Sequence, residues 1–166
     1  MRAHRRRDAW LALVPGGYSA ALDVPTRFGV VPMVLLGSAG AFVLGSVDWP
    51  GMFLRLERWM MVDGDEADLV THRLLRQALE IKHVLARGDA DLHVEPILVA
   101  TDGALVACRG ELEPWGVRFD HLAVLAPVDV PAFIEARPAR HAARQVAAAR
   151  SLLEGGFTGI ARAAGA

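Results

Sequence analysis

A long apolar stretch covers residues 28–47 and contains no charged side chain. About 20 apolar residues are enough to cross a bilayer as a helix, but the turn sequence Gly-Ser-Ala-Gly divides this run into residues 30–36 and 41–44. Glycine supplies the backbone conformations that short hairpin turns require. We therefore expect two buried strands joined by a hairpin, and a single membrane-spanning helix over residues 28–47 is the alternative.

The segments around this hairpin carry weaker patterns. Residues 10–14 form a short apolar run, which predicts a first strand, and residues 15–27 contain proline and glycine, which predict a loop. Residues 52–61 alternate between apolar and polar side chains, as expected of a strand with one buried face. We expect this strand to complete a three-stranded antiparallel meander with the two hairpin strands.

A long helix is predicted after the acidic segment 63–68. Its acidic side chains favour a helix N-terminus, and apolar residues then recur on one helical face up to residue 85. The helix is expected to end near Gly88. Beyond it the pattern predicts strands over residues 94–100, 104–108 and 122–125, followed by helices over residues 130–136 and 139–153.

Together these elements predict an α+β fold, in which a mixed β-sheet contains an antiparallel meander and is flanked by helices. The length of 166 residues fits one domain with a buried core. We expect this domain to cover residues 9–154, with residues 1–8 as a basic flexible N-terminus and residues 155–166 as a flexible C-terminal tail.

Composition and charge exclude several classes of function. The 18 Lys and Arg residues are balanced by 19 Asp and Glu residues, a formal net charge of −1, so the chain has no overall attraction to nucleic acid or to acidic membranes. Lys82 is the only lysine and Cys108 the only cysteine, which excludes an internal disulfide and a thiolate metal cluster. We expect a cytoplasmic protein with no membrane partner.

One motif resembles a known family. Residues 32–51 read PMVLLGSAGAFVLGSVDWPG, which is similar to the signature of the nuclease-related (NERD) domain, a branch of the PD-(D/E)XK endonuclease-like fold. In that family the first hairpin strand opens with Asp, a Gly-x-x-Gly-x-Phe turn follows, and the second strand ends in Glu-x-Lys before Asn-Trp-x-Gly. The resemblance covers about residues 28–154 and implies a restriction-endonuclease-like fold. The framework residues are present at Gly37, Gly40, Phe42, Trp49 and Gly51.

The catalytic positions of this motif are degenerate. Metal-dependent nucleases of this fold hold Mg²⁺ with two carboxylates on adjacent strands and use a lysine to orient or activate water. The matching positions hold Pro32 instead of the Asp, Gly45 instead of the Glu and Val47 instead of the Lys, and these residues offer no metal ligand and no proton. The resemblance therefore implies an inactive domain without catalytic residues, metal or cofactor, which acts as a binding or scaffold module for nucleic acid or a protein partner.

Two relocated nuclease sites are alternatives. Asp120, in Phe-Asp-His, followed by Glu135, in Glu-Ala-Arg, would give a residual Mg²⁺-dependent nuclease, although Pro131 interrupts the strand that such a site needs. The second candidate is Glu80 with Lys82, the only Glu-x-Lys of the chain. It falls in the predicted long helix, where side chains two residues apart point about 200° apart, so we interpret these residues as solvated helix charges.

Arginines near the C-terminus are the candidate nucleic-acid ligands. Four of them lie on or near the last predicted helix, and together they would form a phosphate-binding patch if they converge on one face. The alternative is that they solvate the helix surface. Trp49, Trp59 and Trp115 would add stacking platforms for bases if they are exposed. The four arginines are Arg137, Arg140, Arg144 and Arg150.

Overall fold

The structure is a computed structural model of the chain. It describes residues 2–47, 53–56, 59–62, 65–66, 68–100, 111–113, 116–119 and 122–155, and it describes side chains in the ranges 7–46, 71–100 and 122–155. In chain order the elements are α1 (Arg2–Leu11), β1 (Ser19–Thr26), β2 (Gly29–Gly37), β3 (Gly40–Val47), β4 (Phe53–Leu56), β5 (Trp59–Val62), β6 (Asp65–Glu66), α2 (Asp68–Arg87), β7 (Val94–Ala100), β8 (Glu111–Glu113), β9 (Gly116–Phe119), β10 (Leu122–Leu125), a 3₁₀ turn (Pro127–Asp129), α3 (Val130–Glu135) and α4 (Ala143–Glu154).

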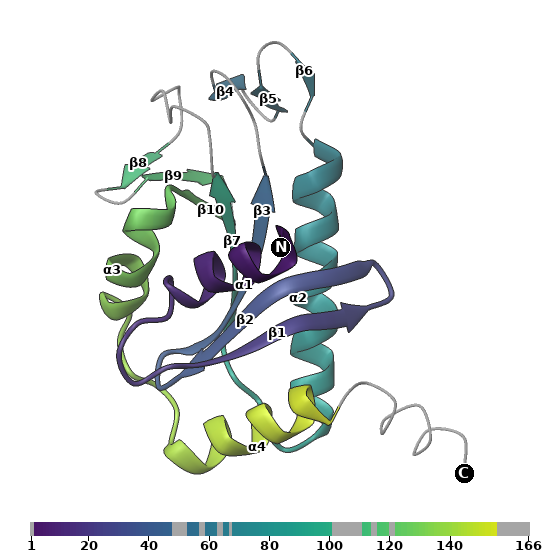
Figure 1. Ribbon diagram of the computed structural model, residues 1–166, viewed down its shortest axis with the longest axis vertical. Helices are drawn as coiled ribbons and strands as arrows, with labels where there is room; N and C mark the ends of the chain where they lie inside the picture. The colour runs from purple at the N-terminus through teal and green to yellow at the C-terminus, as the bar shows by residue number, and fades with distance from the viewer. Residues whose placement is uncertain are drawn as a thin grey trace.

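A mixed sheet forms the centre of the molecule (Figure 1). Its strand order is β1-β2-β3-β7-β10-β9-β8. β1, β2 and β3 form an antiparallel meander, β7 is parallel to both β3 and β10, and β10-β9-β8 is antiparallel. Strands β4, β5 and β6 form a separate small sheet. The predicted α+β class, with a mixed sheet, a meander and flanking helices, is therefore confirmed.

Helices cover both faces of the central sheet and divide the core into two clusters. On one face α2 and α4 pack through Leu74, Ile81, Leu85 and Leu153. The three α2 residues, Leu74, Ile81 and Leu85, follow the helical spacing of a single stripe, because side chains three, four or seven positions apart lie on one side of a helix. On the other face the α1 segment and α3 contribute a second set of buried side chains, including Trp10, Leu13, Phe133 and Ile134. The sheet is thus the middle of three layers.

Several predicted elements are confirmed. The apolar stretch forms the β2–β3 hairpin, so the alternative of a membrane-spanning helix over residues 28–47 is wrong. Among the described residues, no helix combines the length and apolar character needed to cross a bilayer. The long helix ends at Arg87, one residue before Gly88. The strand at residues 122–125 and the strand at residues 94–100 have the predicted bounds, whereas the strand predicted over residues 104–108 lies outside the described residues.

The N-terminal predictions are wrong in two places. Residues 10–14 do not form a strand, because α1 runs to Leu11 and places Trp10 in the core. This helix also includes most of residues 1–8, the segment interpreted as a flexible terminus. Residues 15–27 are not a loop, because residues 19–26 form β1. Proline within this segment argued against a strand, but an edge strand tolerates proline since one row of its N–H groups faces outward.

The third strand of the meander is also different from the prediction. Residues 52–61 contain two strands, β4 and β5, which pair antiparallel with Leu56 opposite Trp59. The chain therefore reverses within a run whose alternation looked continuous. The place beside β3, where consecutive order would put this strand, is taken by β7 in parallel orientation, and the third strand of the meander is β1, which pairs with β2.

The β1–β2 ladder is interrupted at one point. Leu22 pairs with Met33 and Val24 with Val31, but the residues between them, Asp23 and Pro32, form no ladder pair. Pro32 has no N–H to donate. Asp23 adopts a left-handed backbone with φ of 53°, a conformation that aspartate tolerates better than most residues. Asp23 on β1 and Pro32 on β2 thus lie opposite each other at the interruption of the ladder.

The β2–β3 turn packs tightly against the start of β7. Gly40 has φ of 140°, and a Cβ at this position would collide with the carbonyl oxygen of His93. The same carbonyl accepts a hydrogen bond from the N–H of Ala41 at 2.8 Å. A glycine is needed here both for the backbone conformation and for the close approach of two segments.

Substitution of Gly40 by alanine is expected to lower the free energy of unfolding by about 2 kcal/mol or more, because it adds backbone strain and a steric collision. The matched control is Gly16→Ala, at a position with no heavy atom within 4 Å of the added Cβ, where a change within about 0.5 kcal/mol is expected. Urea unfolding followed by circular dichroism measures both. Equal stability of the two variants would contradict the packing at Gly40.

Candidate functional site

The β2–β3 hairpin brings two of the degenerate motif positions together. Met33 pairs with Leu44, so the next position outward in this antiparallel register places Pro32 opposite Gly45. Val47 is the last residue of β3, two positions after Gly45, and its side chain lies outside the described set. Pro32 and Gly45 thus lie on adjacent strands, and neither offers a metal ligand in its side chain.

Helix α2 fills the space next to Gly45. A Cβ on Gly45 would lie 3.1 Å from both terminal methyl carbons of Leu74, and Leu74 is only 2% exposed. A glutamate here would have to displace this core side chain. Pro32 on the neighbouring strand carries no ligand atom in its side chain. Among the described residues, no group of three His, Cys, Asp or Glu side chains is placed to hold a metal ion.

The alternative nuclease residues are not brought into an adjacent-strand arrangement by the described part of the chain. Glu135 is the last residue of helix α3 and is exposed. Asp120 follows β9 and lies outside the described residues. A helical Glu135 does not supply the strand carboxylate that the Asp120 and Glu135 hypothesis requires.

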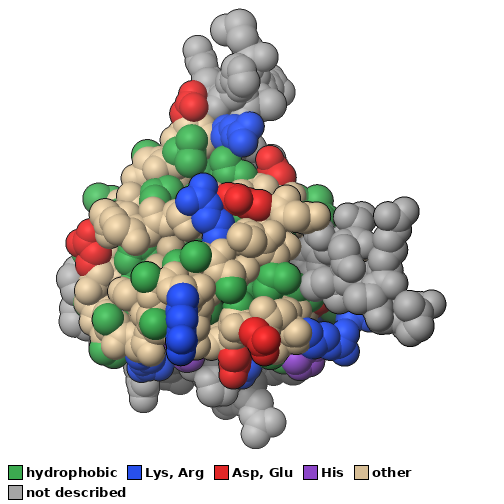
Figure 2. Space-filling view, turned by 90° about the horizontal axis from the view of Figure 1, so that it is seen from below, with side chains coloured by type: hydrophobic (Ala, Val, Ile, Leu, Met, Phe, Trp, Pro, Cys, Tyr) green, Lys and Arg blue, Asp and Glu red, His purple; other side chains and the backbone are tan. Residues whose placement is uncertain are grey.

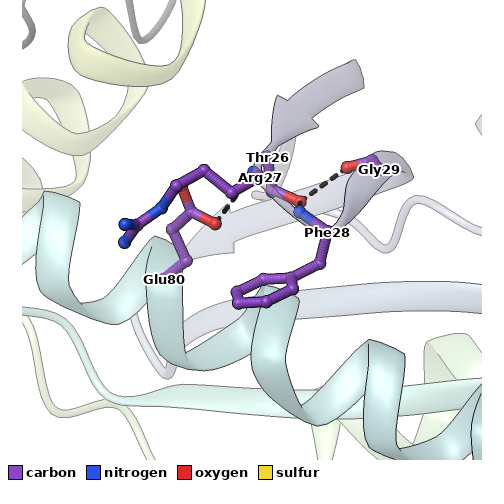
Figure 3. Close-up of polar contacts among 5 residues, drawn as sticks. All are labelled: Thr26, Arg27, Phe28, Gly29 and Glu80. Atoms are coloured by element: carbon purple, nitrogen blue, oxygen red, sulfur yellow. Dashed lines mark hydrogen bonds and ion pairs between the residues drawn. The ribbon is translucent and has the colours of Figure 1, made fainter.

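Glu80 has a structural contact instead of a solvated surface position (Figure 3). Its Oε2 accepts the backbone N–H of Arg27 at 3.0 Å, and its Oε1 accepts from Arg27 Nε at 3.4 Å. The Glu80 side chain is 10% exposed and that of Arg27 is 82% exposed. The interpretation of Glu80 as a solvated helix charge is therefore wrong. The residue is confirmed as helical, and it anchors the β1–β2 turn to α2.

Hydrogen bonds within the β1–β2 turn complete this anchor. Thr26 Oγ1 donates to the carbonyl of Gly29 at 2.6 Å and accepts from the N–H of Phe28 at 3.2 Å (Figure 3). Gln77 Nε2 donates to the carbonyl of Phe28 at 3.4 Å. Gln77, which lies on α2, thus holds the turn that precedes β2.

A pocket of about 270 Å³ lies at the beginnings of β3 and β7, beside the β2–β3 turn. One wall is the connection between α3 and α4. This connection is fixed to the turn, because the backbone N–H groups of Arg140 and His141 donate to the carbonyl of Ser38 at 2.7 and 2.9 Å. It is fixed to β7 by the N–H of His93, which donates to His141 Nε2 at 3.0 Å. The pocket is lined by Ala39, Phe42, His93, Glu95, Arg137, Pro138 and Arg140.

The inner wall of this pocket contains a buried ion pair. Arg137 Nη2 donates to Glu95 Oε1 at 2.9 Å, and the Glu95 side chain is 8% exposed. The guanidinium carbon of Arg137 lies 4.0 Å from the ring centroid of Phe133, while its buried Nε has no hydrogen-bond partner among the described residues. Arg137 therefore acts within the fold, because a buried carboxylate needs a paired cation.

The other arginines of the predicted patch have different surroundings. Arg150 Nε bonds Glu154 Oε1 at 2.6 Å, one helical turn away. Arg140 lines the pocket and Arg144 lies on α4, and both are exposed. Seen from below, Lys and Arg side chains are interspersed with acidic and apolar ones and do not form a uniform basic face (Figure 2). The side chains of Trp49, Trp59 and Trp115 lie outside the described set.

His93 and Glu95 were missed by the sequence analysis. They lie two residues apart at the start of β7, so they share one face of the strand, and His93 Nε2 is 3.9 Å from Glu95 Oε2. The available signal was a histidine just before an otherwise apolar strand and a glutamate at its second position. Burial, followed by the positive charge of Arg140, lowers the pKa of His93 below its ordinary value of 6.5.

Comparison of the chain with protein-family models, with curated proteins and with solved structures gave no match. The resemblance to the nuclease-related family therefore rests on the sequence pattern alone, above all on the motif over residues 32–51.

Glu80→Ala is expected to destabilise the fold by about 1 kcal/mol, because the N–H of Arg27 loses a charged acceptor. Arg27→Ala removes only the exposed ion pair and leaves the backbone contact, so its effect should stay within about 0.5 kcal/mol. Chemical denaturation of both variants tests this difference. A larger loss in Arg27→Ala than in Glu80→Ala would show that the side-chain ion pair dominates the contact.

Protonation of His93 is expected to weaken the fold. Since its pKa is lower in the folded state than its ordinary value of 6.5, the unfolded chain binds the proton first and stability falls as the pH drops through this region. The free energy of unfolding of His93→Gln should therefore decline less between about pH 8 and about pH 5 than that of the wild type. His83→Gln, at an exposed position on α2, is the control and should keep the wild-type pH dependence.

Proposed function

We propose that this chain is a catalytically inactive member of the nuclease-related class, with a restriction-endonuclease-like fold, and that it serves as a binding or scaffold module. The observation that carries this proposal is that Pro32 and Gly45, which directly follow the last β2–β3 pair, Met33 with Leu44, stand at the positions where the family pattern has metal-binding carboxylates. The order of the β2–β3 hairpin, the helix α2 and the strand β7, which is parallel to β3, supports the proposal.

The packing of α2 supports the loss of activity independently of the sequence pattern. A hard cation such as Mg²⁺ requires several oxygen ligands in a defined arrangement. At this place the hairpin offers a proline and a glycine, and the space beside the glycine contains Leu74. Framework glycines remain where the turn needs them, at Gly37 and Gly40. A fold kept without its ligands is expected of a domain selected for binding.

A protein partner is the favoured occupant, with nucleic acid as the competing class. Arg137 and Arg150 are engaged by Glu95 and Glu154, which leaves Arg140 and Arg144 as the members of the predicted patch without an acidic partner among the described side chains. Binding to a phosphate backbone depends on many uncompensated cations. Two exposed arginines on a surface of mixed charge, in a chain of net charge −1, fit a protein interface better.

The catalytic part of the proposal is tested with the full chain, supercoiled plasmid and single-stranded DNA in the presence of Mg²⁺ or Mn²⁺. No metal-dependent cleavage is expected. The proposal of an inactive domain would be contradicted if DNA is cleaved and the cleavage is lost both on addition of a chelator and in Asp120→Ala or Glu135→Ala. Such a result would establish the alternative, a residual nuclease.

The partner class is tested by gel shift of the same nucleic acids at low and moderate salt. No salt-sensitive shift is expected for the wild type. A shift that is lost in the double variant Arg140→Gln with Arg144→Gln would overturn the preference for a protein partner and assign these side chains to phosphate contacts.

A further inference from the structure

We infer that the pocket between the β2–β3 turn, the start of β7 and the α3–α4 connection binds a small oxyanion, a carboxylate or a phosphate monoester, through Arg140. This inference goes beyond the proposed function and does not depend on it, because the pocket lies at the opposite end of β3 from Gly45 and Val47. It would hold in a catalytic or an inactive domain.

The pocket is preorganised by backbone contacts. The carbonyl of Ser38 receives two N–H groups from the α3–α4 connection, and His141 receives the N–H of His93. The turn itself is fixed against His93 by the close approach of Gly40. A site whose walls are held by hydrogen bonds loses little conformational entropy on binding. The side chain of Arg140 takes no part in these bonds, so it is available to a ligand.

The charge balance of the lining residues favours an anion. Glu95 and Arg137 form a close ion pair, and their formal charges cancel. Arg140 has no ion-pair partner among the described side chains. Its guanidinium presents a planar set of donors that matches a carboxylate or phosphate group. The remaining cation at this pocket therefore selects for negative charge.

The size and lining of the pocket restrict the ligand. Its volume of about 270 Å³ is slightly below the range of about 300–1,000 Å³ that is usual for drug-sized ligands. The apolar lining residues are Ala39, Phe42 and Pro138. A compact molecule with one oxyanion and a small apolar part fits these dimensions, whereas a larger ligand would extend out of the pocket.

His93 provides a local reporter for an anion at this position. Burial and the charge of Arg140 lower its pKa, and the neighbouring groups that contribute to its field are Glu95, His141 and Lys82. An anion bound at Arg140 offsets the charge of that arginine. The pKa of His93 should then rise toward its ordinary value.

The experiment is a calorimetric titration of the full chain, in low-chloride buffer, with benzoate and with phenyl phosphate as the two probes. We expect saturable binding of at least one probe. Stronger binding of phenyl phosphate supports a phosphate ligand, and stronger binding of benzoate supports a carboxylate ligand. The pKa of His93, followed by NMR of its imidazole, should rise when the bound probe is present.

Matched arginine variants separate a built site from general surface charge. Arg140→Gln keeps the backbone bond to Ser38 and should weaken binding about tenfold, which is the effect of losing one charged hydrogen-bond donor. Arg144→Gln makes the same charge change outside the pocket and should stay within about twofold. Any one of three results would overturn the inference. These are no saturable binding of either probe, a pKa of His93 that does not change when a probe is bound, and equal losses of binding affinity in the two variants.

Discussion

The packing of helix α2 against the β2–β3 hairpin is the contact on which the rest of the structure depends. Gly45 has no side chain, and the methyl groups of Leu74 occupy the space beside it. This close approach lets the apolar stripe of α2 continue along the sheet through Ile81 and Leu85. Two polar residues of α2 hold the β1–β2 turn. Gln77 donates to the carbonyl of Phe28, and Glu80 accepts the N–H of Arg27.

The same contact bears on the proposed absence of a metal site. A side chain at residue 45 and the buried Leu74 compete for one volume, because an added Cβ would lie 3.1 Å from the leucine methyl groups and protein interiors are close-packed. In this chain Leu74 occupies that volume and contributes buried apolar area to the core.

Local patterns predicted the elements that have one clear periodicity. The hairpin around residues 37–40 and the long helix were predicted because turn glycines and a helical stripe are short-range signals. Residues 10–14 were assigned wrongly since a short apolar run fits a strand or a buried helix equally well. β1 was missed because Pro25 and Asp23 resemble loop residues, and only its place at the sheet edge makes them compatible with a strand.

The site was less accessible to sequence reasoning because its parts are distant in the chain. Glu95 and Arg137 are 42 residues apart, and their pairing depends on β7 and the α3–α4 connection meeting at one end of the sheet. Composition suggested that the arginines form one group. In the structure the position of each one decides its role, so Arg137 neutralises a buried acid and Arg140 faces a pocket.

The interruption of β1 has a consequence for association between molecules. β1 is the last strand on its side of the sheet, and a free edge is a template on which another chain can add a strand. Pro25 has no N–H to donate, and the left-handed backbone of Asp23 interrupts the regular course of the strand. An incoming strand would meet too few regularly spaced N–H and C=O groups along β1 to extend the sheet. The irregularity therefore disfavours edge-to-edge aggregation.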